Sequence, residues 1–514
     1  MIINKMKIKI RTNQYVMVMA LLVSVMLACA NDDTGISETQ VTIDAVATDD
    51  ILDAQERAQV TQTISGSASG GYVEDGNAVA IIVNGVTYST TLSSGIFSAE
   101  VSTRDIVKDT DKRIVVLVTS ITQTGNDVVK GTSKLVTIDG EVELKEFTHP
   151  GLLVNQDAFN RIKAKVDAGT EPWISGWNKL ITNPHASLNY NPSPVVKLIR
   201  GGGSREEPES DNYSTAFNDA AAAFQTAIRW KVTGDDAYAD KSIQILNAWA
   251  STCESISGDS NRALAAGIYG YQFANAAEIM RDYEGWSVED FTDFKKWIVD
   301  VFYTVSKDFI DTHYNTCLSH YWANWDLANI ANILSISVLI ENEEMYDFAL
   351  NYLKTGDGNG NLNKAIYYIH PDGLGQLQES GRDQGHALLC VGFFGDLARM
   401  AYNQGEDLFA YDDNRILKGA EYAAKYNVAS LSVPYEPYNN CDNVNQTVIS
   451  DVGRGNERPI WENLYNHYVV KMGYDSPYLK FAAETYRAEG GGGDYGPNSG
   501  GFDSLGFGTL LYSE

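Results

Sequence analysis

Six polar side chains that can bind ligands or move protons lie within eleven residues: Gln376, Gln378, Glu379, Arg382, Asp383 and His386. A Pro-Asp-Gly turn precedes them, and an apolar helical pattern follows them. A helix that begins near Glu379 would carry Glu379, Arg382 and His386 on one face of its first two turns. A carboxylate, a guanidinium and an imidazole gathered there predict a site. The alternative is a solvated helix start with a capping salt bridge.

A second polar group lies in the sequence S-H-Y-W-A-N-W-D-L-A-N-I, residues 319–330. His320 and Asn324 are four residues apart and share a predicted helical face, with Trp322 and Trp325 beside it. Burying a histidine and an asparagine between two tryptophans is costly unless their polar atoms have partners. This group is therefore either part of the same site or a satisfied core network.

Arginine and aromatic residues recur in the predicted loops, at Arg200, Arg205, Tyr438, Arg454, Arg458 and Trp461. Arginine binds carboxylates through two parallel hydrogen bonds, and tryptophan stacks on pyranose rings, so this composition suits acidic sugars. The glycine-rich loop at residues 200–213 lacks the Gly-Lys-Ser/Thr of a phosphate loop; its alternative is disorder. Tyr271, on a predicted helix with Asn275, is a further candidate, although an aromatic there is more often core.

The elements that must position these residues are mostly helices. Amphipathic patterns predict helices at Ser214–Thr233, Asp236–Ala250, Asn261–Tyr283, Val288–Asp311, Trp322–Glu341, Glu343–Lys354, His386–Asn403 and Leu417–Tyr426. Helices joined by short loops, without strand patterns among them, predict an all-α domain over residues 146–514.

Residues 41–145 have a different pattern, with short β-branched runs separated by glycine and asparagine turns. Such spacing predicts a β-sandwich. The runs I-S-G-S-A, V-N-G-V-T-Y and G-I-F-S-A-E-V, with a closing V-T-I-D, resemble bacterial immunoglobulin-like repeats of surface proteins. That resemblance implies a spacer, because the segment has no obvious aromatic platform for a glycan.

The N-terminus predicts export. Four basic residues precede an apolar run that ends at Leu27-Ala28-Cys29, which is the pattern of a bacterial lipoprotein signal over residues 1–28. We expect Cys29 to be lipidated, residues 29–40 to form a tether, and the protein to be periplasmic or on the cell surface. The lipid anchor would be its only membrane contact.

Cleavage would leave 35 of the 39 basic residues against 67 acidic ones, a net charge of −32. So acidic a chain argues against nucleic acid as a partner. The four remaining cysteines, at 253, 317, 390 and 441, include no C-x-x-C motif, so we expect neither a metal site nor a cofactor. They could form disulfides, and their pairing stays open at this point.

Three stretches closely resemble bacterial alginate lyase family proteins, particularly those like polysaccharide lyase family 38. They are A-N-W-D-L-A-N-I-A-N-I-L, H-P-D-G-L-G-Q-L-Q-E-S-G-R-D-Q-G-H and Y-D-D-N-R-I-L-K-G-A-E-Y-A-A-K-Y-N. The resemblance runs from about Gly151 to the C-terminus. It implies an (α/α) toroid, an incomplete barrel of helix pairs with the site in a cleft at one end.

The resemblance also implies a reaction. Such lyases remove H5 of a uronate and expel the 4-linked sugar by β-elimination, which requires a carboxylate neutraliser, a base and an acid. Asn324 with Trp325 resembles the Asn-Trp of toroid lyases, whose asparagine binds the uronate carboxylate. Gln378 stands near the place of an expected histidine, and His320 is offset by one residue from the Asn-His of polysaccharide lyase family 5.

We therefore expect a lyase that acts on an anionic polysaccharide, alginate or a related polyuronate. The expected catalytic residues are Asn324 and Arg382 as neutralisers, His386 as base, and Tyr321 or a tyrosine of the 435–438 loop as acid, with His320 beside them. The expected substrate-binding residues are Gln378, Glu379, Trp325, Arg205, Tyr271, Tyr438, Arg454, Arg458 and Trp461. The alternatives are a glucuronan lyase, a glycoside hydrolase that uses Glu379 and Asp383, and a glycan-binding lipoprotein without activity.

Overall fold

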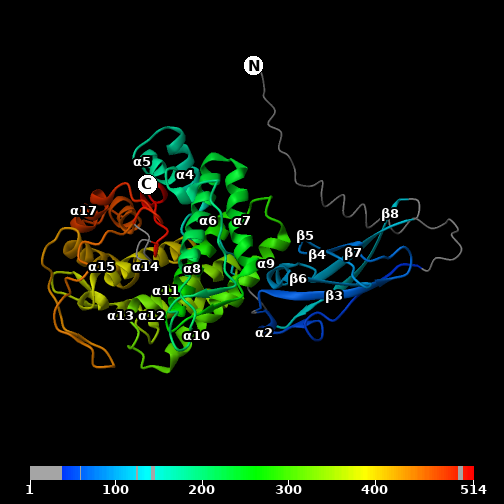
Figure 1. Ribbon diagram of the computed structural model, residues 1–514, viewed down its shortest axis with the longest axis horizontal. Coiled ribbons are helices and arrows are strands. Elements are labelled where there is room, and N and C mark those ends of the chain that lie inside the picture. The colour runs from blue at the N-terminus through cyan, green and yellow to red at the C-terminus, as the bar shows by residue number, and fades with distance from the viewer. Residues whose placement is uncertain (1–37, 58, 123–124, 141–144, 496–501) are drawn as a thin grey trace, which may run out of the picture.

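The computed structural model describes residues 38–514 apart from 58, 123–124, 141–144 and 496–501. The predicted signal peptide and the lipidation site at Cys29 lie outside the described residues. A small β domain and a larger helical domain lie side by side along the long axis of the molecule (Figure 1).

The β domain is a sandwich of two antiparallel sheets. One sheet has the order β1 (Gln40–Ile43), β3 (Thr61–Ser69) and β6 (Ile96–Ser102), and the other β5 (Val86–Thr91), β4 (Ala78–Val83), β7 (Arg113–Ile121) and β8 (Asp127–Leu135). A short parallel pair joins β2 (Ile51–Leu52) to β9 (Thr137–Ile138). Alternate residues of β7 are buried, so each strand presents one apolar face to the shared core, as the period-2 pattern predicts. Two short helices, α2 (Ala54–Arg57) and α3 (Thr103–Lys108), complete the domain.

The helical domain is an all-α (α/α) toroid with an inner layer of long buried helices. These are α6 (Ser214–Thr233), α8 (Arg262–Met280), α11 (Ala323–Leu339) and α14 (Gln384–Asn403). Each packs against the next, α6 on α8, α8 on α11 and α11 on α14. Every residue of α8 after Arg262 is buried, so this helix is enclosed on all sides rather than amphipathic.

Outer helices cover this layer: α7 (Asp236–Thr252), α9 (Val288–Ile298), α10 (Thr304–Thr312), α12 (Glu343–Thr355) and α15 (Tyr411–Asn427). The remaining helices are α4 (Gln156–Asp167), α5 (Trp173–Ile181), α13 (Leu362–Ala365), α16 (Trp461–Tyr465), α17 (Pro477–Tyr486) and α18 (Gly508–Leu511). Short strand pairs occur between them: β10 (Lys197–Ile199) with β11 (Ser255–Ser257), β12 (Ile366–Ile369) with β13 (Gly375–Leu377), and β14 (Tyr438–Asn439) with β15 (Asn445–Gln446).

Close contact between α8 and α11 depends on small residues. A Cβ atom on Gly267 would lie 2.8 Å from the backbone carbon of Ala328, and one on Gly270 would lie 2.1 Å from Oδ1 of Asn332. Because backbone atoms cannot move aside cheaply, larger residues would push the two helices apart. This contact fixes the position of α11, whose first turn reaches the candidate site.

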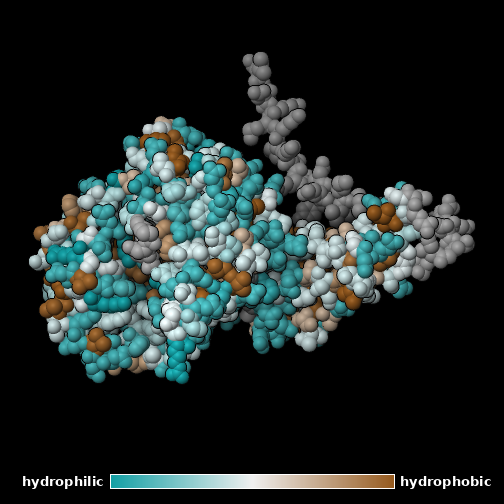
Figure 2. Space-filling model, in the orientation of Figure 1, coloured by the Kyte–Doolittle hydropathy of each residue, from teal (hydrophilic) through white to brown (hydrophobic). Residues whose placement is uncertain are grey.

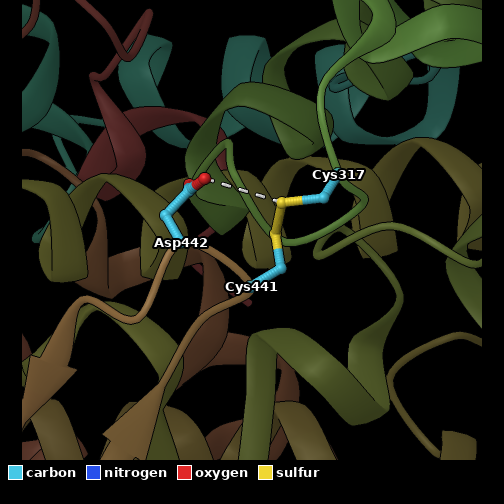
Figure 3. Close-up of side chains that lie close together, drawn as sticks. All are labelled: Cys317, Cys441 and Asp442. Atoms are coloured by element: carbon cyan, nitrogen blue, oxygen red, sulfur yellow. Dashed lines mark hydrogen bonds between the residues drawn. A yellow bond between two sulfur atoms is a disulfide. The ribbon is translucent and has the colours of Figure 1, made fainter.

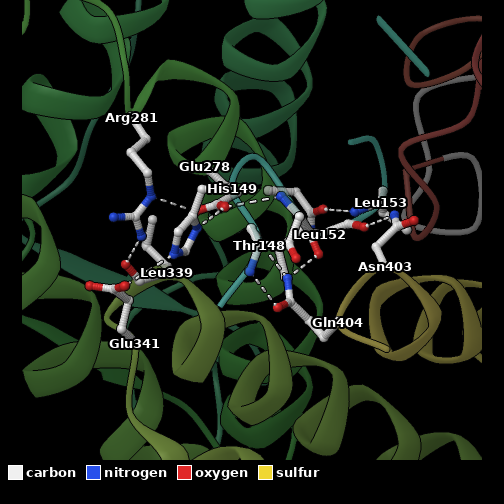
Figure 4. A network of polar contacts seen from close by, with 12 residues as sticks. Thr148, His149, Leu152, Leu153, Glu278, Arg281, Leu339, Glu341, Asn403 and Gln404 are labelled. Carbon is white, nitrogen blue, oxygen red and sulfur yellow. Dashed lines mark hydrogen bonds and ion pairs between the residues drawn. The ribbon is translucent and has the colours of Figure 1, made fainter. Parts of the chain in front are cut away.

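A polar network around His149, shown in Figure 4, lies where the two domains meet. Nδ1 of His149 lies 2.6 Å from Glu278 of α8, and its Nε2 lies 3.4 Å from Glu341 at the end of α11. Lys108 of the sandwich reaches the same Glu341 carboxylate at 3.1 Å, and Arg281 pairs with Glu278 at 3.1 Å. The sandwich is thus held against the side of the toroid by ion pairs.

The face of the molecule shown in Figure 2 is largely hydrophilic, with scattered small apolar areas, as the high charge predicts. Within the described part of the chain, no helix combines the length and apolar character that crossing a membrane requires. A pocket of about 580 Å³ lies at the domain junction, lined by residues such as Glu100 of the sandwich and Lys296 of α9. None of the candidate site residues lines it.

Candidate functional site

The candidate site forms where the first turns of α11 and α14 meet a short 3-10 turn at Gln378–Gly381 and the loop at residues 435–446. The helix predicted over His386–Asn403 forms, and it does not extend back to Glu379. Helix α14 begins at Gln384, after Asp383 has capped it by accepting a hydrogen bond from the His386 backbone N–H at 2.8 Å. An aspartate just before an apolar run is a strong N-cap, which explains the later start.

The carboxylate of Glu379 is the centre of the site, although its side chain is fully buried. Its Oε1 accepts hydrogen bonds from the backbone N–H of Asn324 at 2.8 Å and from Nδ2 of the same residue at 2.6 Å. Its Oε2 accepts one from Arg382 at 2.9 Å, and Cys390 Sγ lies 3.5 Å from Oε1. The start of helix α11 further favours a negative charge at this point. Glu379 therefore binds Asn324 and Arg382 rather than facing an open cleft.

This arrangement leaves Asn324 with one unused polar atom. The side chain is fully buried, and its Oδ1 has no hydrogen-bond partner among the described residues. A buried carbonyl oxygen without a partner is unfavourable, and such groups often mark functional sites. Asn324 is thus held by Glu379 on one side and unsatisfied on the other.

Arg382 is the exposed cation of the site, with about a quarter of its side chain accessible. Its guanidinium lies 5.5 Å from the ring centre of Trp322, in a cation–π contact. Its Nη2 lies 3.3 Å from Nε2 of His386. The guanidinium is therefore oriented by an aromatic face, a buried carboxylate and an imidazole, while part of it remains available to an anion.

His386 forms a pair with Asp383. Its Nδ1 lies 2.6 Å from Oδ2 of Asp383, so we assign the Nδ1 proton to that hydrogen bond. Nε2 then carries the lone pair and accepts from Arg382. Burial raises the pKa of Asp383, but hydrogen bonds and charge from His386, with help from Arg382, outweigh burial and lower that pKa overall. An ionised aspartate behind a partly exposed imidazole is suited to making Nε2 a base.

Tyr438 lies across from these groups on the 435–446 loop. Gln378, itself buried, donates a hydrogen bond from Nε2 to the Tyr438 hydroxyl oxygen at 2.9 Å. The hydroxyl proton is then free to be donated elsewhere. Burial raises the pKa of Tyr438, so its hydroxyl stays protonated at neutral pH. The Tyr438 ring lies 6.0 Å from that of Trp322, which places Trp322 between the phenol and Arg382.

Two of the other tyrosine and tryptophan candidates pack together beneath this surface. Tyr321 is 8% exposed, and its ring lies 4.8 Å from that of Trp325 and 5.0 Å from Phe309. Burial raises the pKa of Tyr321. The structure therefore packs Tyr321 and Trp325 against each other and against Phe309, whereas Tyr438 lies beside Trp322.

His320 binds the same 435–446 loop that carries Tyr438. Its Nδ1 lies 2.7 Å from Oδ2 of Asp442, next to a disulfide between Cys317 and Cys441 (Figure 3). Cys253 and Cys390 are free and buried. The sulfur atoms of Cys317 and Cys441 lie near the Asp442 carboxylate, but a disulfide offers no thiolate, so this group is unsuited to a metal ion.

Several predicted sugar-binding residues instead lie in packed interiors. Tyr271 is fully buried and donates to the Asp503 carbonyl at 2.8 Å, and Arg458 pairs with the Asp503 carboxylate at 2.9 Å. Trp461 is 1% exposed and begins α16. These positions correct the expectation that the three contact substrate, because apolar and ion-pair contacts already enclose them.

The remaining two arginines lie nearer the surface. Arg454 stacks on Tyr426 at 3.8 Å and pairs with Asp451 at 3.3 Å, so it stabilises its own loop. Arg205 is exposed in the 200–213 loop, and neither of these arginines contacts the group around Glu379 in any recorded interaction. The loops that carry these arginines resemble one another in composition. Their composition therefore does not indicate which of them lies at the site.

Sequence reasoning did not select two residues that the structure brings to the site. Trp322 lies between Arg382 and Tyr438, and its position one residue before α11 is the signal that could have identified it. Asn359 is buried, donates to the Tyr321 carbonyl at 2.6 Å and lies beside the Tyr438 hydroxyl. No local pattern marks Asn359, since its role depends on the fold around α11.

Comparison with known proteins adds a family to this geometry. The family model described as alginate lyase matches residues 178–431. Among solved structures, an alginate lyase from Bacteroides ovatus is 14% identical, with a TM-score of 0.47 and coverage of 71% of this chain and 100% of that chain. Alginate lyase A1-III from Sphingomonas species A1 is also 14% identical, with a TM-score of 0.48 and coverage of 71% and 96%.

The N-terminal sandwich has separate relatives. A bacterial immunoglobulin-like domain from the M. primoryensis ice-binding adhesin is 37% identical over 19% of this chain and 95% of that domain, with a TM-score of 0.18. No curated protein matches the chain. The matched family segment contains Trp322, Asn324, Glu379, Arg382 and His386. The helical domain of this chain is therefore a member of the alginate lyase family of polysaccharide lyases.

Proposed function

We propose that this protein cleaves 1,4-linked uronate polymers, alginate foremost, by β-elimination that leaves an unsaturated sugar on the product. The observation that carries the proposal is the position of Arg382. A partly exposed guanidinium lies over Trp322 and beside His386 in a chain that is strongly acidic overall. Such a cation attracts one substrate carboxylate at short range, although the net negative charge of the protein repels anions.

Neutralising that carboxylate is the first requirement of the reaction. Loss of H5 turns a uronate into a dianionic enolate, and donors directed at the carboxylate lower that barrier. In the proposal, Nη2 of Arg382 leaves His386 and donates a hydrogen bond to the substrate carboxylate. Nη1 stays bound to Glu379, which keeps the guanidinium in place. Asn324, fixed by the same Glu379, lines the carboxylate site through its amide.

The proton transfers then fall to two side chains. His386 accepts H5 at Nε2, because its Nδ1 is bound to Asp383 and the ionised aspartate stabilises the imidazolium that forms. Tyr438 donates its hydroxyl proton to the leaving oxygen, since Gln378 already occupies an oxygen lone pair. Trp322 offers its face to the sugar ring between them. The scheme uses no metal and no cofactor.

Hydrolysis by Glu379 and Asp383 fits the structure less well. A glycosidase needs two carboxyl groups that flank the scissile bond, one of them able to donate a proton. Glu379 is fully buried and already accepts hydrogen bonds from Asn324 and Arg382, and Asp383 caps a helix and holds His386. Neither carboxylate is free to reach a sugar.

We also propose that the protein is an exported lipoprotein anchored at Cys29 and facing the periplasm or the cell surface. The disulfide between Cys317 and Cys441 supports this, because structural disulfides persist in oxidising compartments. Mass spectrometry of the mature N-terminus tests it, with an acylated Cys29 expected and an unmodified terminus at another residue contradicting it.

Incubation with polymannuronate, polyguluronate and glucuronan tests the activity and ranks the substrates. The conjugated double bond of the product absorbs in the ultraviolet, so a rising absorbance is expected with at least one of these polymers. Binding to all of them without such a product would leave a glycan-binding protein and contradict the proposal.

A further inference from the structure

The loop that carries Tyr438 has little regular structure to hold it. It connects α15, which ends at Asn427, to α16, which begins at Trp461, and its only strands are the two-residue pair β14 and β15. Side chains such as Val444 and Val448 are exposed, so few apolar contacts fix it. A connection of this length is normally mobile, and each ordered residue costs conformational entropy. Before Tyr438 the loop is held by hydrogen bonds between Gln376 and the backbone of Glu436 and from Tyr422 to the Pro434 carbonyl. The part after Tyr438 needs an anchor of its own.

Three cross-links supply this anchor, and all lead to the segment just before Trp322. Cys441 forms the disulfide with Cys317, 124 residues away in the sequence. The backbone N–H of Cys441 donates to Ser319 Oγ at 2.8 Å. The next residue, Asp442, binds His320 at 2.7 Å. Figure 3 shows the disulfide and the Asp442 carboxylate next to each other on these two segments.

We propose that the Cys317–Cys441 disulfide and the His320–Asp442 pair form a positioning clamp that holds the hydroxyl of Tyr438 opposite Trp322 and Arg382. The proposal rests on the proposed lyase function, because positioning matters only if Tyr438 takes part in the reaction. The clamp fixes the two segments that bring Trp322 and Tyr438 to ring contact at 6.0 Å. It acts on catalysis through Tyr438 and touches no reacting atom itself.

The clamp also gives His320 a role that its sequence position concealed. An exposed histidine two residues before a site tryptophan suggests a catalytic base, yet its Nδ1 is committed to Asp442 on the opposite loop. A positioning pair and a catalytic base differ in a measurable way. If the two residues only form a positioning pair, removal of either one lowers kcat by the same factor. If His320 is a base, its removal lowers kcat far more than removal of Asp442 does.

The disulfide is tested with the full chain carrying Cys317→Ser and Cys441→Ser, compared with wild type in the presence and absence of dithiothreitol. Both cysteines are exposed residues, so dithiothreitol can reduce the bond to two thiols while it becomes a cyclic disulfide itself. We expect kcat on a uronate oligomer to fall by roughly tenfold or more in the variant and in reduced wild type, with a much smaller change in KM. Dithiothreitol should leave the variant unchanged.

Two controls separate positioning from loss of fold. Cys253→Ala removes a buried free thiol elsewhere and keeps the disulfide, so it should have wild-type kcat before reduction and lose as much kcat as wild type on addition of dithiothreitol. Hydrogen exchange in the double variant should rise at residues 435–446 and stay as in wild type along α8. A folded double variant with wild-type kcat and unchanged exchange in that loop would overturn the proposal.

The histidine pair is tested by a double-mutant cycle of His320→Ala and Asp442→Ala. We expect each single variant to lower kcat by the same factor and the double variant to lower it no further, because both remove one contact. If His320→Ala lowers kcat much more than Asp442→Ala, His320 acts in the chemistry and the positioning role is wrong.

Failure of the clamp can be told from failure of the lyase function. If wild type forms no unsaturated product from any uronate polymer, the proposed function fails, and the clamp is judged by hydrogen exchange alone. Exchange that rises at residues 435–446 on reduction then supports a clamp on this loop, and unchanged protection overturns it.

Discussion

At the scale of single residues, Glu379 is the group on which the others depend. It fixes the amide of Asn324 and the guanidinium of Arg382 with one buried carboxylate. A buried ion pair adds little net stability, but loss of one partner leaves an uncompensated charge. Glu379 therefore contributes more to the orientation of the Asn324 and Arg382 side chains than to the stability of the fold.

The first prediction concerns Arg382. We expect Arg382→Ala to lower kcat by roughly a hundredfold, the scale seen when one donor to a developing negative charge is lost. Kinetics on a uronate oligomer of defined length measure it. Arg454→Ala is the matched control, because Arg454, like Arg382, pairs with a carboxylate three residues away and stacks on an aromatic ring. Its kcat should stay near wild type, and equal losses in both variants would show that Arg382 has no special role.

The chemistry of single residues was predictable where types and spacing were unusual. The grouping of Arg382, His386 and Asn324 followed from the two polar stretches, and the structure brings them together around Glu379. The status of Trp461 and Arg458 was not predictable, because a tryptophan and an arginine in an apparent loop look the same before burial is known. Partners such as Asp503 lie far away in sequence and only the fold supplies them.

At the scale of elements, the site depends on where two helices begin. Helix α11 begins next to Trp322 and presents its first backbone N–H groups to Gln378 and Glu379. Helix α14 begins at Gln384, with Asp383 as its cap and His386 in its first turn. Sequence periodicity placed both helix starts within two residues, at Trp322 and His386. It did not reveal the 3-10 turn before α14, because that turn has no periodic signature.

The second prediction separates the two roles of Asp383. Asp383→Ala should cost about 1 kcal/mol of stability from the lost cap and should also lower kcat, since His386 loses its hydrogen-bond acceptor. Asp235→Ala is the control, because Asp235 caps α7 by the same kind of hydrogen bond at a surface far from the site chemistry. Urea unfolding and kcat are measured for both. A kcat loss no larger in Asp383→Ala than in Asp235→Ala would mean that the cap alone explains the residue.

At the scale of the whole molecule, the two domains meet through the network around His149 and Glu341. Burial lowers the pKa of His149, but hydrogen bonds to Glu278 and Glu341 outweigh it and raise that pKa above 6.5. Burial raises the pKa of Glu341, but its hydrogen bond to His149 and the charges of Arg281 and Lys108 lower it well below 4.5. The junction therefore holds both charges over a window of mildly acidic pH.

The third prediction follows from the signs of these shifts. Stability from His149 is fully present below its unfolded pKa and is lost as pH rises through the raised folded value. Stability from Glu341 is present above its unfolded pKa and is lost as pH falls through the lowered value. His149→Ala should thus destabilise the protein more between about pH 5 and 6 than near pH 9. Urea unfolding at these values measures it, with Lys163→Ala, from a surface pair, as the control. A penalty that does not change with pH would contradict the account.

The domain plan was the part most open to prediction from sequence. Alternating β-branched runs and long amphipathic patterns distinguish a sandwich from a toroid before any contact is known, as β7 and α12 illustrate. The junction was not predictable, because His149, Glu278 and Glu341 are remote in the chain and unremarkable in type. Likewise the long predicted helix from Val288 to Asp311 is interrupted by a π-helical segment, Val299–Tyr303, that periodicity does not reveal.

The central claim is that the site built around Arg382 and His386 cleaves uronate chains by elimination rather than by hydrolysis. Mass spectrometry of the products from one defined oligouronate tests it most directly. Elimination takes up no water, so the two product masses should sum to the substrate mass, one product should carry a double bond, and His386→Ala should lose this activity by roughly a hundredfold or more. Products whose masses together exceed that of the substrate by one water would contradict the account.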